Sequence, residues 1–329
     1  MKITLLGAGA WGTALAIAFT GKHDITLWSR EADVAVDLLK TRENTRFFPG
    51  YKLPESVAVA TDFAAAVSGA DLLVVATPIA GLRPTAERLK ALGSKVPLLW
   101  VCKGFEAGSG KLPHQVVAEV LGEQAVCGAL SGPSFAEEVA AGQPTAVALA
   151  ANDPQFARAT ARQLHTRRLR IYANDDLIGD EVGGAVKNVL AIATGICDGL
   201  GLGLNSRAAL MTRGLAEIAR LGLALGAHRE TFMGLAGMGD LILTCTGDLS
   251  RNRRVGLALA QNKSLPQILK ELGHVAEGVY TAREVDRLAK SLGVDMPISA
   301  AVAAILDGRV NASEALELLM ARDPKEEAV

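Results

Sequence analysis

The chain has 329 residues, half of them apolar and 21% charged, which is an ordinary balance for a globular protein with material for two cores. Its 34 basic and 35 acidic side chains nearly cancel, so no net field favours nucleic acid or an anionic membrane. A phosphate-bearing partner therefore needs a local basic site. The four cysteines are far apart and form no CxxC, so we expect neither a disulfide framework nor a metal site but reduced thiols in a cytoplasmic protein.

Short apolar runs alternate with helical patterns through the first half of the chain. The predicted strands are Lys2–Leu6, Ile25–Trp28, Leu72–Ala76, Leu98–Val101 and Val126–Leu130, and the predicted helices between them are Ala10–Thr20, Glu31–Thr41, Ile79–Leu92 and Pro113–Leu121. Strands joined by crossover helices indicate a parallel sheet covered on both faces. Two more strands, Thr145–Ala150 and Leu169–Tyr172, flank a helix at Pro154–His165 and would extend or edge the same sheet.

After Tyr172 the strand pattern stops and only helical patterns follow. The predicted helices are Asp175–Gly199, Ser206–Gly226, Ser250–Gln261, Leu265–Leu272, Thr281–Leu292, Ser299–Asp307 and Asn311–Met320, the last with Asn311 as N-cap. We therefore predict an α/β protein with two domains. Residues 1–173 form a Rossmann-type, doubly wound, mainly parallel dinucleotide-binding domain, and residues 174–329 form an all-helical domain for substrate binding and catalysis.

The uncharged stretch from Ile3 to Gly21 superficially resembles a signal peptide. Its four glycines have a better explanation, given below, and no other segment reaches the ~20 uninterrupted apolar residues of a spanning helix. We therefore predict no membrane insertion.

A glycine-rich loop follows the first predicted strand. Gly7-Ala8-Gly9-Ala10-Trp11-Gly12 matches GxGxxG, opens an apolar helix and is followed by a second strand, which completes a βαβ unit. In such loops the first glycine permits a tight turn, the second lets a pyrophosphate approach the backbone, and the third lets helix and strand pack closely. The helix start adds free N–H groups for the phosphates, so the loop predicts dinucleotide binding.

The residue after the second strand reports on the adenosine ribose, and an acidic residue there favours NAD. Here the segment is Ser29-Arg30-Glu31. Arg30 could pair with a 2′-phosphate or stack on adenine, so we expect NADP to be accepted and leave NAD open. The alternative is a solvated arginine at a helix start.

A lysine inside an apolar helix is the best candidate for proton exchange with a carbinol oxygen. Lys187 lies in GGAVKN, where a buried ammonium is costly unless it is paired or used. A desolvated lysine has a lowered pKa and can act as acid or base near neutrality. Asp240, in the glycine-flanked turn predicted at GLAGMGDL, could hold it. The five histidines lie near predicted element ends, where surface or capping roles are expected.

Three further segments complete the candidate site. Ser250-Arg251-Asn252-Arg253-Arg254 opens a helix with a serine cap and guanidinium groups, which together suit a phosphate. Lys103-Gly104 and the segment from Ser131 to Ala136 each follow a predicted strand, at the carboxyl edge where ligands of open sheets bind.

Together these motifs closely resemble those of the bacterial NAD(P)-dependent glycerol-3-phosphate dehydrogenases. The similarity runs from Lys2 to about Ile298 and rests on GAGAWGTALA, CKGFE, LSGPSFAEEVAAGQPTA, GGAVKNVLAI, RGLAEIARLG, GLAGMGDLILTCT, SRNRR and AEG. Two small departures, Ala10-Trp11 in place of serine-tyrosine and SGPSFA in place of SGPTFA, remove no needed functional group. Arg30 stands where members of the family vary.

The resemblance implies NAD(P)H-dependent reduction of dihydroxyacetone phosphate to sn-glycerol 3-phosphate for glycerophospholipid synthesis, with Lys187 as general acid/base and Lys103 and Asp240 beside it. With the motifs above, we expect substrate contacts from Lys103, Gly132, Ser134, Lys187, Asn188, Asp240, Thr244, Ser250, Arg251 and Asn252. We expect cofactor contacts from Gly7, Gly9, Ala10, Trp11, Gly12, Arg30, Lys103, Ala136, Arg251, Val275 and Glu277.

Two other classes of protein stay open at this point. One is a two-domain dehydrogenase of similar plan that acts on a hydroxyacid or sugar acid, also with a lysine in its helical domain. The other is a nucleotide sensor without activity, although the Lys187, Asp240 and Arg251 set argues against it. The predicted helix Ser206–Gly226 could offer a surface for a homodimer.

Overall fold

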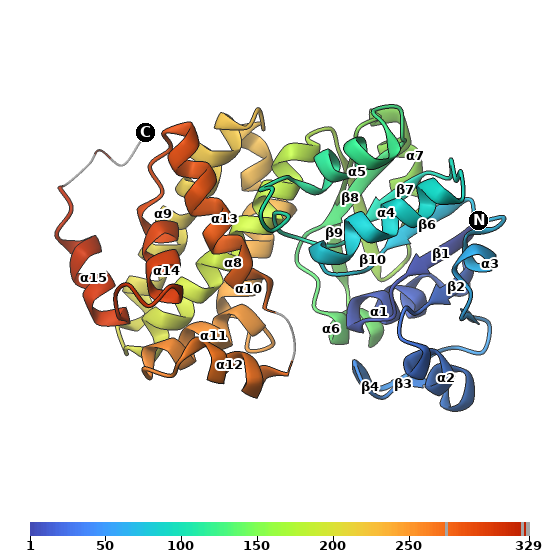
Figure 1. Cartoon of the computed structure of the whole chain (residues 1–329), viewed down its shortest axis with the longest axis horizontal. Helices are drawn as coiled ribbons and strands as arrows, with labels where there is room; N and C mark the ends of the chain where they lie inside the picture. Colours follow the sequence, from blue (N-terminus) through green and yellow to red (C-terminus); the bar gives the residue numbers. More distant parts are fainter. Residues whose placement is uncertain (274–275, 324–325, 327–329) are drawn as a thin grey trace.

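The structure is a computed structural model that describes residues 1–273, 276–323 and 326. A sheet with helices on both faces forms one half of the molecule, and a group of helices forms the other half (Figure 1). This arrangement confirms the predicted fold class. The sheet ends at Asn174 and the next helix begins at Leu177, while the division into domains at residue 173 stays a prediction.

The main sheet has eight strands in the order β10-β9-β8-β7-β6-β1-β2-β5. The strands are β1 Lys2–Leu6, β2 Asp24–Trp28, β5 Ala58–Ala60, β6 Leu72–Val75, β7 Leu98–Trp100, β8 Cys127–Ser131, β9 Thr145–Ala151 and β10 Leu169–Asn174. Neighbouring strands are parallel except for β8 and β9, so β9 and β10 run against the rest. The two late strands extend the sheet as predicted, and β10 is its edge.

Helices cover both faces of this sheet because its strands are apolar on both sides. One face packs on α1 Ala10–Phe19, α2 Ala32–Thr41 and α7 Pro154–Leu164. The other face packs on α3 Phe63–Val67, α4 Leu82–Ala91 and α5 Pro113–Leu121. The first turn of the long helix α8, Leu177–Gly199, joins this second layer through Leu177.

Several short elements were not predicted from the sequence. They are β5, α3, α6 Ala136–Ala140, the 3-10 turn Arg229–Met233, and an antiparallel pair of β3 Glu43–Asn44 with β4 Phe48–Lys52. The two helices and the 3-10 turn hold fewer than two helical turns, while β3 is polar, β4 contains proline and glycine, and β5 has three residues. The predicted helix Ile79–Leu92 begins instead as a 3-10 turn, Ile79–Gly81, before α4.

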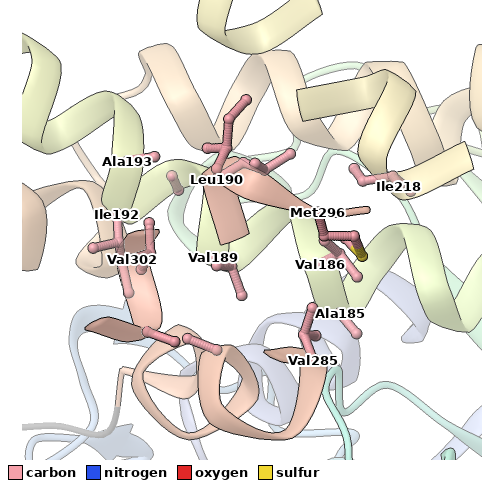
Figure 2. Close-up of a cluster of buried hydrophobic side chains, with 14 of the residues drawn as sticks. Ala185, Val186, Val189, Leu190, Ile192, Ala193, Ile218, Val285, Met296 and Val302 are labelled. Carbon is pink, nitrogen blue, oxygen red and sulfur yellow. The ribbon is translucent and has the colours of Figure 1, made fainter. Parts of the chain in front are cut away.

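Helix α8 is the axis of the helical half, and almost all of its side chains are buried. Around it lie α9 Gly203–Ala224, α10 Asp240–Thr246, α11 Arg251–Ala260, α12 Leu265–Leu272, α13 Glu277–Leu292, α14 Pro297–Leu306 and α15 Ala312–Met320. Figure 2 shows the core that α8 forms with its neighbours, a single cluster that contains Val186 and Leu190 of α8 together with Ile218 of α9, Val285 of α13 and Val302 of α14.

Helices α8 and α11 cross at two glycines. A Cβ on Gly195 would lie 2.1 Å from the backbone oxygen of Arg253, and one on Gly256 would lie 2.1 Å from that of Ile192. Only glycine permits this approach, which fixes the start of α11 against the middle of α8. The Lys187 turn and the Ser250–Asn252 turn are thereby held beside one another.

Two sequence predictions meet different outcomes in this half. Asn311 caps α15 as predicted, since its side chain accepts a hydrogen bond of 2.9 Å from the backbone of Glu314. The predicted turn before Asp240 is wrong, because Leu235–Gly239 forms a π-helical turn that runs directly into α10. Within the described ranges, no helix combines the length and apolar character needed to cross a bilayer.

Candidate active site

The glycine-rich loop has the geometry that its sequence predicts. Gly7 has φ +128°, and a Cβ there would lie 2.6 Å from the backbone oxygen of Ala76 at the end of β6. A Cβ on Gly12 would lie 2.0 Å from the backbone oxygen of Gly7. Around Gly9, in contrast, no heavy atom of the described residues lies within 4 Å of the Cβ position, apart from Gly9 and its two chain neighbours. The outer glycines thus close the turn, and the middle one leaves open space for a ligand.

The start of α1 next to this loop suits a diphosphate. No side chain caps the helix at Gly9, so the first N–H groups, including those of Ala10 and Trp11, have no intrahelical acceptor. Ala136 begins α6, which packs against α1. The residues present therefore fit a bound dinucleotide.

Two predicted cofactor contacts are not joined to this loop by a described interaction. Arg30 follows β2, is well exposed and forms an ion pair of 2.8 Å with Glu31. Its position at the carboxyl end of β2 is the one expected for a ribose contact. Val275 lies outside the described residues.

Lys187 points from α8 to a buried carboxylate. Its Nζ donates to Asp240 Oδ1 and, at 2.8 Å, to Thr244 Oγ1, and only 6% of the residue is exposed. Asp240 and Thr244 lie one turn apart on α10, so they share a face. Burial lowers the pKa of Lys187 to about 8; the Asp240 charge opposes this shift and the Lys103 charge adds to it. The side chain can therefore give a proton as the ammonium, or take one as the neutral amine, near neutral pH.

Lys103 reaches the same carboxylate from the other half of the molecule. It follows β7 and donates to Asp240 Oδ2 at 2.5 Å and to the backbone oxygen of Gly132 at 3.2 Å. Its aliphatic chain crosses α8 at Gly184, where a Cβ would lie 3.5 Å from it. Ser134 adds a hydrogen bond of 3.0 Å to Gly132. Asp240 thus bridges two lysines from the two halves of the chain.

A row of amides continues the site along α8. Asn252 Nδ2 donates to Asn188 Oδ1 at 2.9 Å, and Asn252 Oδ1 accepts from the backbone of Gly278 at 3.0 Å. Ser250 caps α11 by accepting from the backbone of Arg253 at 3.2 Å. Arg251, the first residue of α11, is exposed. Together the cap, the free helix start and the guanidinium form an anion-binding surface.

Glu277 connects this surface to the sheet. Burial raises the pKa of its carboxyl, while the charges of Arg251, Lys103 and Lys187 and the backbone of Ile79 oppose the rise. Ile79 follows β6, the strand that supports the glycine-rich loop at Ala76. The predicted site residues from the two halves therefore meet at the carboxyl ends of β6, β7 and β8.

An acidic cluster at the start of α8 escaped the sequence prediction. Glu181 is buried and accepts from the backbone of His114 at 2.8 Å and from its ring. Burial tends to lower the pKa of His114, but Glu181 outweighs that effect and raises it. Asp180 is fully buried, and its one described partner is Asn174, which donates at 2.7 Å. The sequence does contain a signal for this cluster, because two adjacent acidic residues, Asp180 and Glu181, lie within an otherwise apolar helix.

Replacing Asp180 by asparagine should stabilise the protein at pH 8. Burial raises the pKa of Asp180 from 3.8 to about 7, so the folded state binds a proton more tightly than the unfolded state between these values, and stability falls as the pH rises through that window. The gain should be roughly 2–4 kcal/mol at pH 8 and should vanish near pH 4. Urea unfolding at both pH values measures it. Asp175→Asn, an exposed neighbour, should change neither value; equal effects of the two changes would refute the explanation.

Among the described residues, no group of three or more His, Cys, Asp or Glu side chains could hold a metal ion. The fold and the cluster of Lys187, Asp240 and Lys103 define a class of protein, the two-domain dinucleotide-dependent dehydrogenases. In this class the helical half of the chain carries polar residues for the chemistry. Within that class, residues 2–157 match the family model "NAD-dependent glycerol-3-phosphate dehydrogenase N-terminus" and residues 176–317 match the model of its C-terminus. The chain belongs to the NAD-dependent glycerol-3-phosphate dehydrogenase family.

Individual relatives are similar over their full length. The chain is 87% identical to a glycerol-3-phosphate dehydrogenase [NAD(P)+] of Dechloromonas aromatica, with 99% of both chains covered. It is 62% identical to one of Aromatoleum aromaticum, covering 99% of this chain and 100% of that one. The crystal structure of the Coxiella burnetii glycerol-3-phosphate dehydrogenase superposes with a TM-score of 0.93 at 43% identity, covering 98% of this chain and 99% of that one.

Proposed function

We propose that the protein reduces dihydroxyacetone phosphate to sn-glycerol 3-phosphate, reversibly, with a nicotinamide dinucleotide, and so supplies glycerophospholipid synthesis. The observation that carries this is the buried Lys187–Asp240–Lys103 cluster at the carboxyl ends of β7 and β8. An anion-binding helix start lies beside it at Ser250–Asn252. A three-carbon phosphate ester needs both groups, one for its carbonyl and one for its phosphate.

Lys187 is the general acid of the reduction. The bound dinucleotide supplies the hydride, and the Lys187 ammonium gives its proton to the carbonyl oxygen as that oxygen becomes a hydroxyl. Asp240 holds the ammonium in place, and Lys103 stabilises the negative charge that develops on the same oxygen. In the reverse direction the neutral amine of Lys187 accepts the proton from the alcohol.

The phosphate is held by the start of α11. Arg251 and the helix N–H groups bind its oxygens, with Ser250, Asn252 and Asn188 positioned around it. Gly132, Ser134 and Thr244 line the substrate between the two lysines. Water is excluded where Lys187, Asp240 and Thr244 are buried.

The cofactor site extends over both halves of the chain. We assign the pyrophosphate to Gly7, Gly9, Ala10, Trp11 and Gly12, and the ribose end to Arg30, whose exposed guanidinium accommodates a 2′-phosphate. NADPH and NADH both fit this assignment. Ala136, Lys103, Arg251 and Glu277 complete it, with Val275 as a predicted contact.

We also propose a cytoplasmic location and a homodimer. The four cysteines are free and buried, which suits a reducing compartment. Two large apolar side chains of α9, Leu204 and Leu223, are exposed, and pairing of two copies through the region around α9 would cover them. Sedimentation of the purified chain tests the second proposal directly.

An assay of NADH and NADPH oxidation tests the activity. We expect oxidation of either cofactor to require dihydroxyacetone phosphate. Faster turnover of a 2-oxo acid such as pyruvate would instead identify a hydroxyacid dehydrogenase. Binding of NADPH without oxidation in the presence of any triose phosphate would identify a sensor.

Replacing Arg251 by alanine should raise the KM for dihydroxyacetone phosphate by about 10–100-fold, because one charge-assisted hydrogen bond to the phosphate is lost. The kcat should change less, and a smaller rise in the KM for NADPH is expected from its place beside Glu277. Steady-state kinetics measure all three values. Arg229→Ala, at an exposed arginine of the 3-10 turn Arg229–Met233 outside the candidate site, is the control and should leave them unchanged.

A further inference from the structure

A second cationic site lies on the edge of the sheet, away from the active-site cluster. Five arginines occur between residues 158 and 170, and all are exposed: Arg158, Arg162, Arg167, Arg168 and Arg170. The sequence from Pro154 to Asn174 contains no acidic residue. None of these arginines forms an ion pair with a carboxylate in the part of the chain that the structure describes. This local charge stands out in a chain whose net charge is −1.

Part of this cluster faces a hollow between α7 and β10. The hollow has a volume of about 420 Å³, and its lining includes Arg158, Arg162 and His165, with Tyr172 of β10 as a further polar residue. Arg158 and Arg162 are spaced i and i+4, so they lie on one face of α7, and His165 follows directly at the end of that helix. Ile171 of β10 adds apolar lining. A smaller hollow of about 190 Å³ shares Arg158 and continues toward Asn174.

The opposite wall of the hollow is an unpaired strand edge. Among the residues that the structure describes, β10 pairs with β9 only and ends the sheet, so along its outer side alternate backbone N–H groups have no strand partner there. Phosphate oxygens accept hydrogen bonds from backbone N–H groups and from guanidinium groups, and a concave space bordered by both suits a phosphate.

The spacing of Arg158 and Arg162 has a cost when nothing is bound. Like charges at i and i+4 of a helix destabilise it by about 0.2–0.5 kcal/mol, and a bound anion would reverse that repulsion. Charges that only protect a sheet edge belong on the strand, where Arg170 already lies over the ring of Tyr172. The arginines of α7 are therefore left without a role in edge protection.

We propose that the hollow between α7 and β10 binds a small phosphate-bearing molecule at Arg158, Arg162 and His165. Its volume lies within the range of small-molecule sites, about 300–1,000 Å³, which favours a compact ligand over a flat polymer or membrane surface. None of its lining residues belongs to the proposed active site.

Binding of inorganic pyrophosphate, measured by calorimetry at constant ionic strength, tests the proposal. All proteins carry Arg251→Ala and Gly9→Ala, which weaken the two competing sites, the proposed substrate phosphate site and the glycine-rich loop. In this background R158Q/R162Q should weaken binding by about tenfold or more, the loss of at least one charge-assisted contact. The matched control R167Q/R168Q removes the same charge from residues that do not line the hollow, and it should retain the affinity within about twofold.

Equal weakening by the two double variants would overturn the proposal, because it would mean a diffuse field rather than a site. An affinity untouched by R158Q/R162Q would overturn it as well. Sedimentation with phosphatidylglycerol vesicles covers the competing explanation: vesicle binding that both double variants reduce equally, without pyrophosphate binding, would assign the cluster to a membrane surface instead. Thermal unfolding of each variant verifies that the fold is intact.

Discussion

Replacing Lys187 by alanine should lower kcat for dihydroxyacetone phosphate reduction by about 10²–10⁴-fold, the usual contribution of a positioned proton donor. The affinity for NADPH should stay near that of the wild type, since the glycine-rich loop lies on the other half of the chain. Stopped-flow kinetics and NADPH fluorescence titration separate the two effects. Because the alanine leaves a cavity beside the buried Asp240, Lys187→Met should be measured as well; it keeps the volume and should lose turnover equally.

The same lysine predicts opposite pH profiles for the two directions. With a pKa of about 8, the ammonium is present below that pH and the amine above it. The kcat/KM for reduction should therefore fall as the pH rises through about 8, and that for oxidation of glycerol 3-phosphate should rise through the same value. Lys270→Ala, an exposed lysine on α12, should alter neither profile. Turnover that survives both changes at Lys187 would refute its role as acid and base.

The contacts of Lys187 with Asp240 could be anticipated from chemistry but not located from sequence spacing. A lysine in an apolar helix needs a counter-charge, and GLAGMGDL offered one. The two residues are 53 positions apart, however, and come together because the π-helical turn packs on α8: a Cβ on Gly183 would lie 2.6 Å from the backbone oxygen of Ala236. A π-helical turn has no distinctive periodicity, so the segment was mistaken for a plain turn.

The buried parallel strands and their crossover helices were predictable because unbroken apolar runs alternate with helical patterns along the first half of the chain. The direction of β9 and β10 was not, since an apolar run such as Thr145–Ala151 carries no mark of its orientation. The hydrogen-bond partners of the buried acidic residues could not be predicted either. Glu181 and His114 are 67 positions apart, and their pairing depends on how α5 meets α8.

Alanine at Gly9 and alanine at Gly12 should have different consequences although both abolish the GxGxxG pattern. Gly9 has an extended conformation, φ −76° and ψ −178°, and free space around its Cβ position. Gly9→Ala should therefore fold with the stability of the wild type. Its methyl group would occupy the space that a pyrophosphate needs near the backbone, so the Kd for NADPH should rise by about tenfold or more, at least 1.4 kcal/mol.

Gly12→Ala should lower both the stability of the fold and the affinity for NADPH. Its Cβ would lie 2.0 Å from the backbone oxygen of Gly7 and 3.0 Å from the Cβ of Ala76, and backbone atoms cannot yield as the end of a flexible side chain does. The loop must move away from β6, which should cost about 1–3 kcal/mol of stability and displace the helix start that binds phosphate. Denaturant unfolding measures the stability of Gly9→Ala and Gly12→Ala, and NADPH titration measures their Kd values. Wild-type affinity in Gly9→Ala would mean that the pyrophosphate lies elsewhere, and wild-type stability in Gly12→Ala would mean that the close packing of α1 against β6 does not hold the loop.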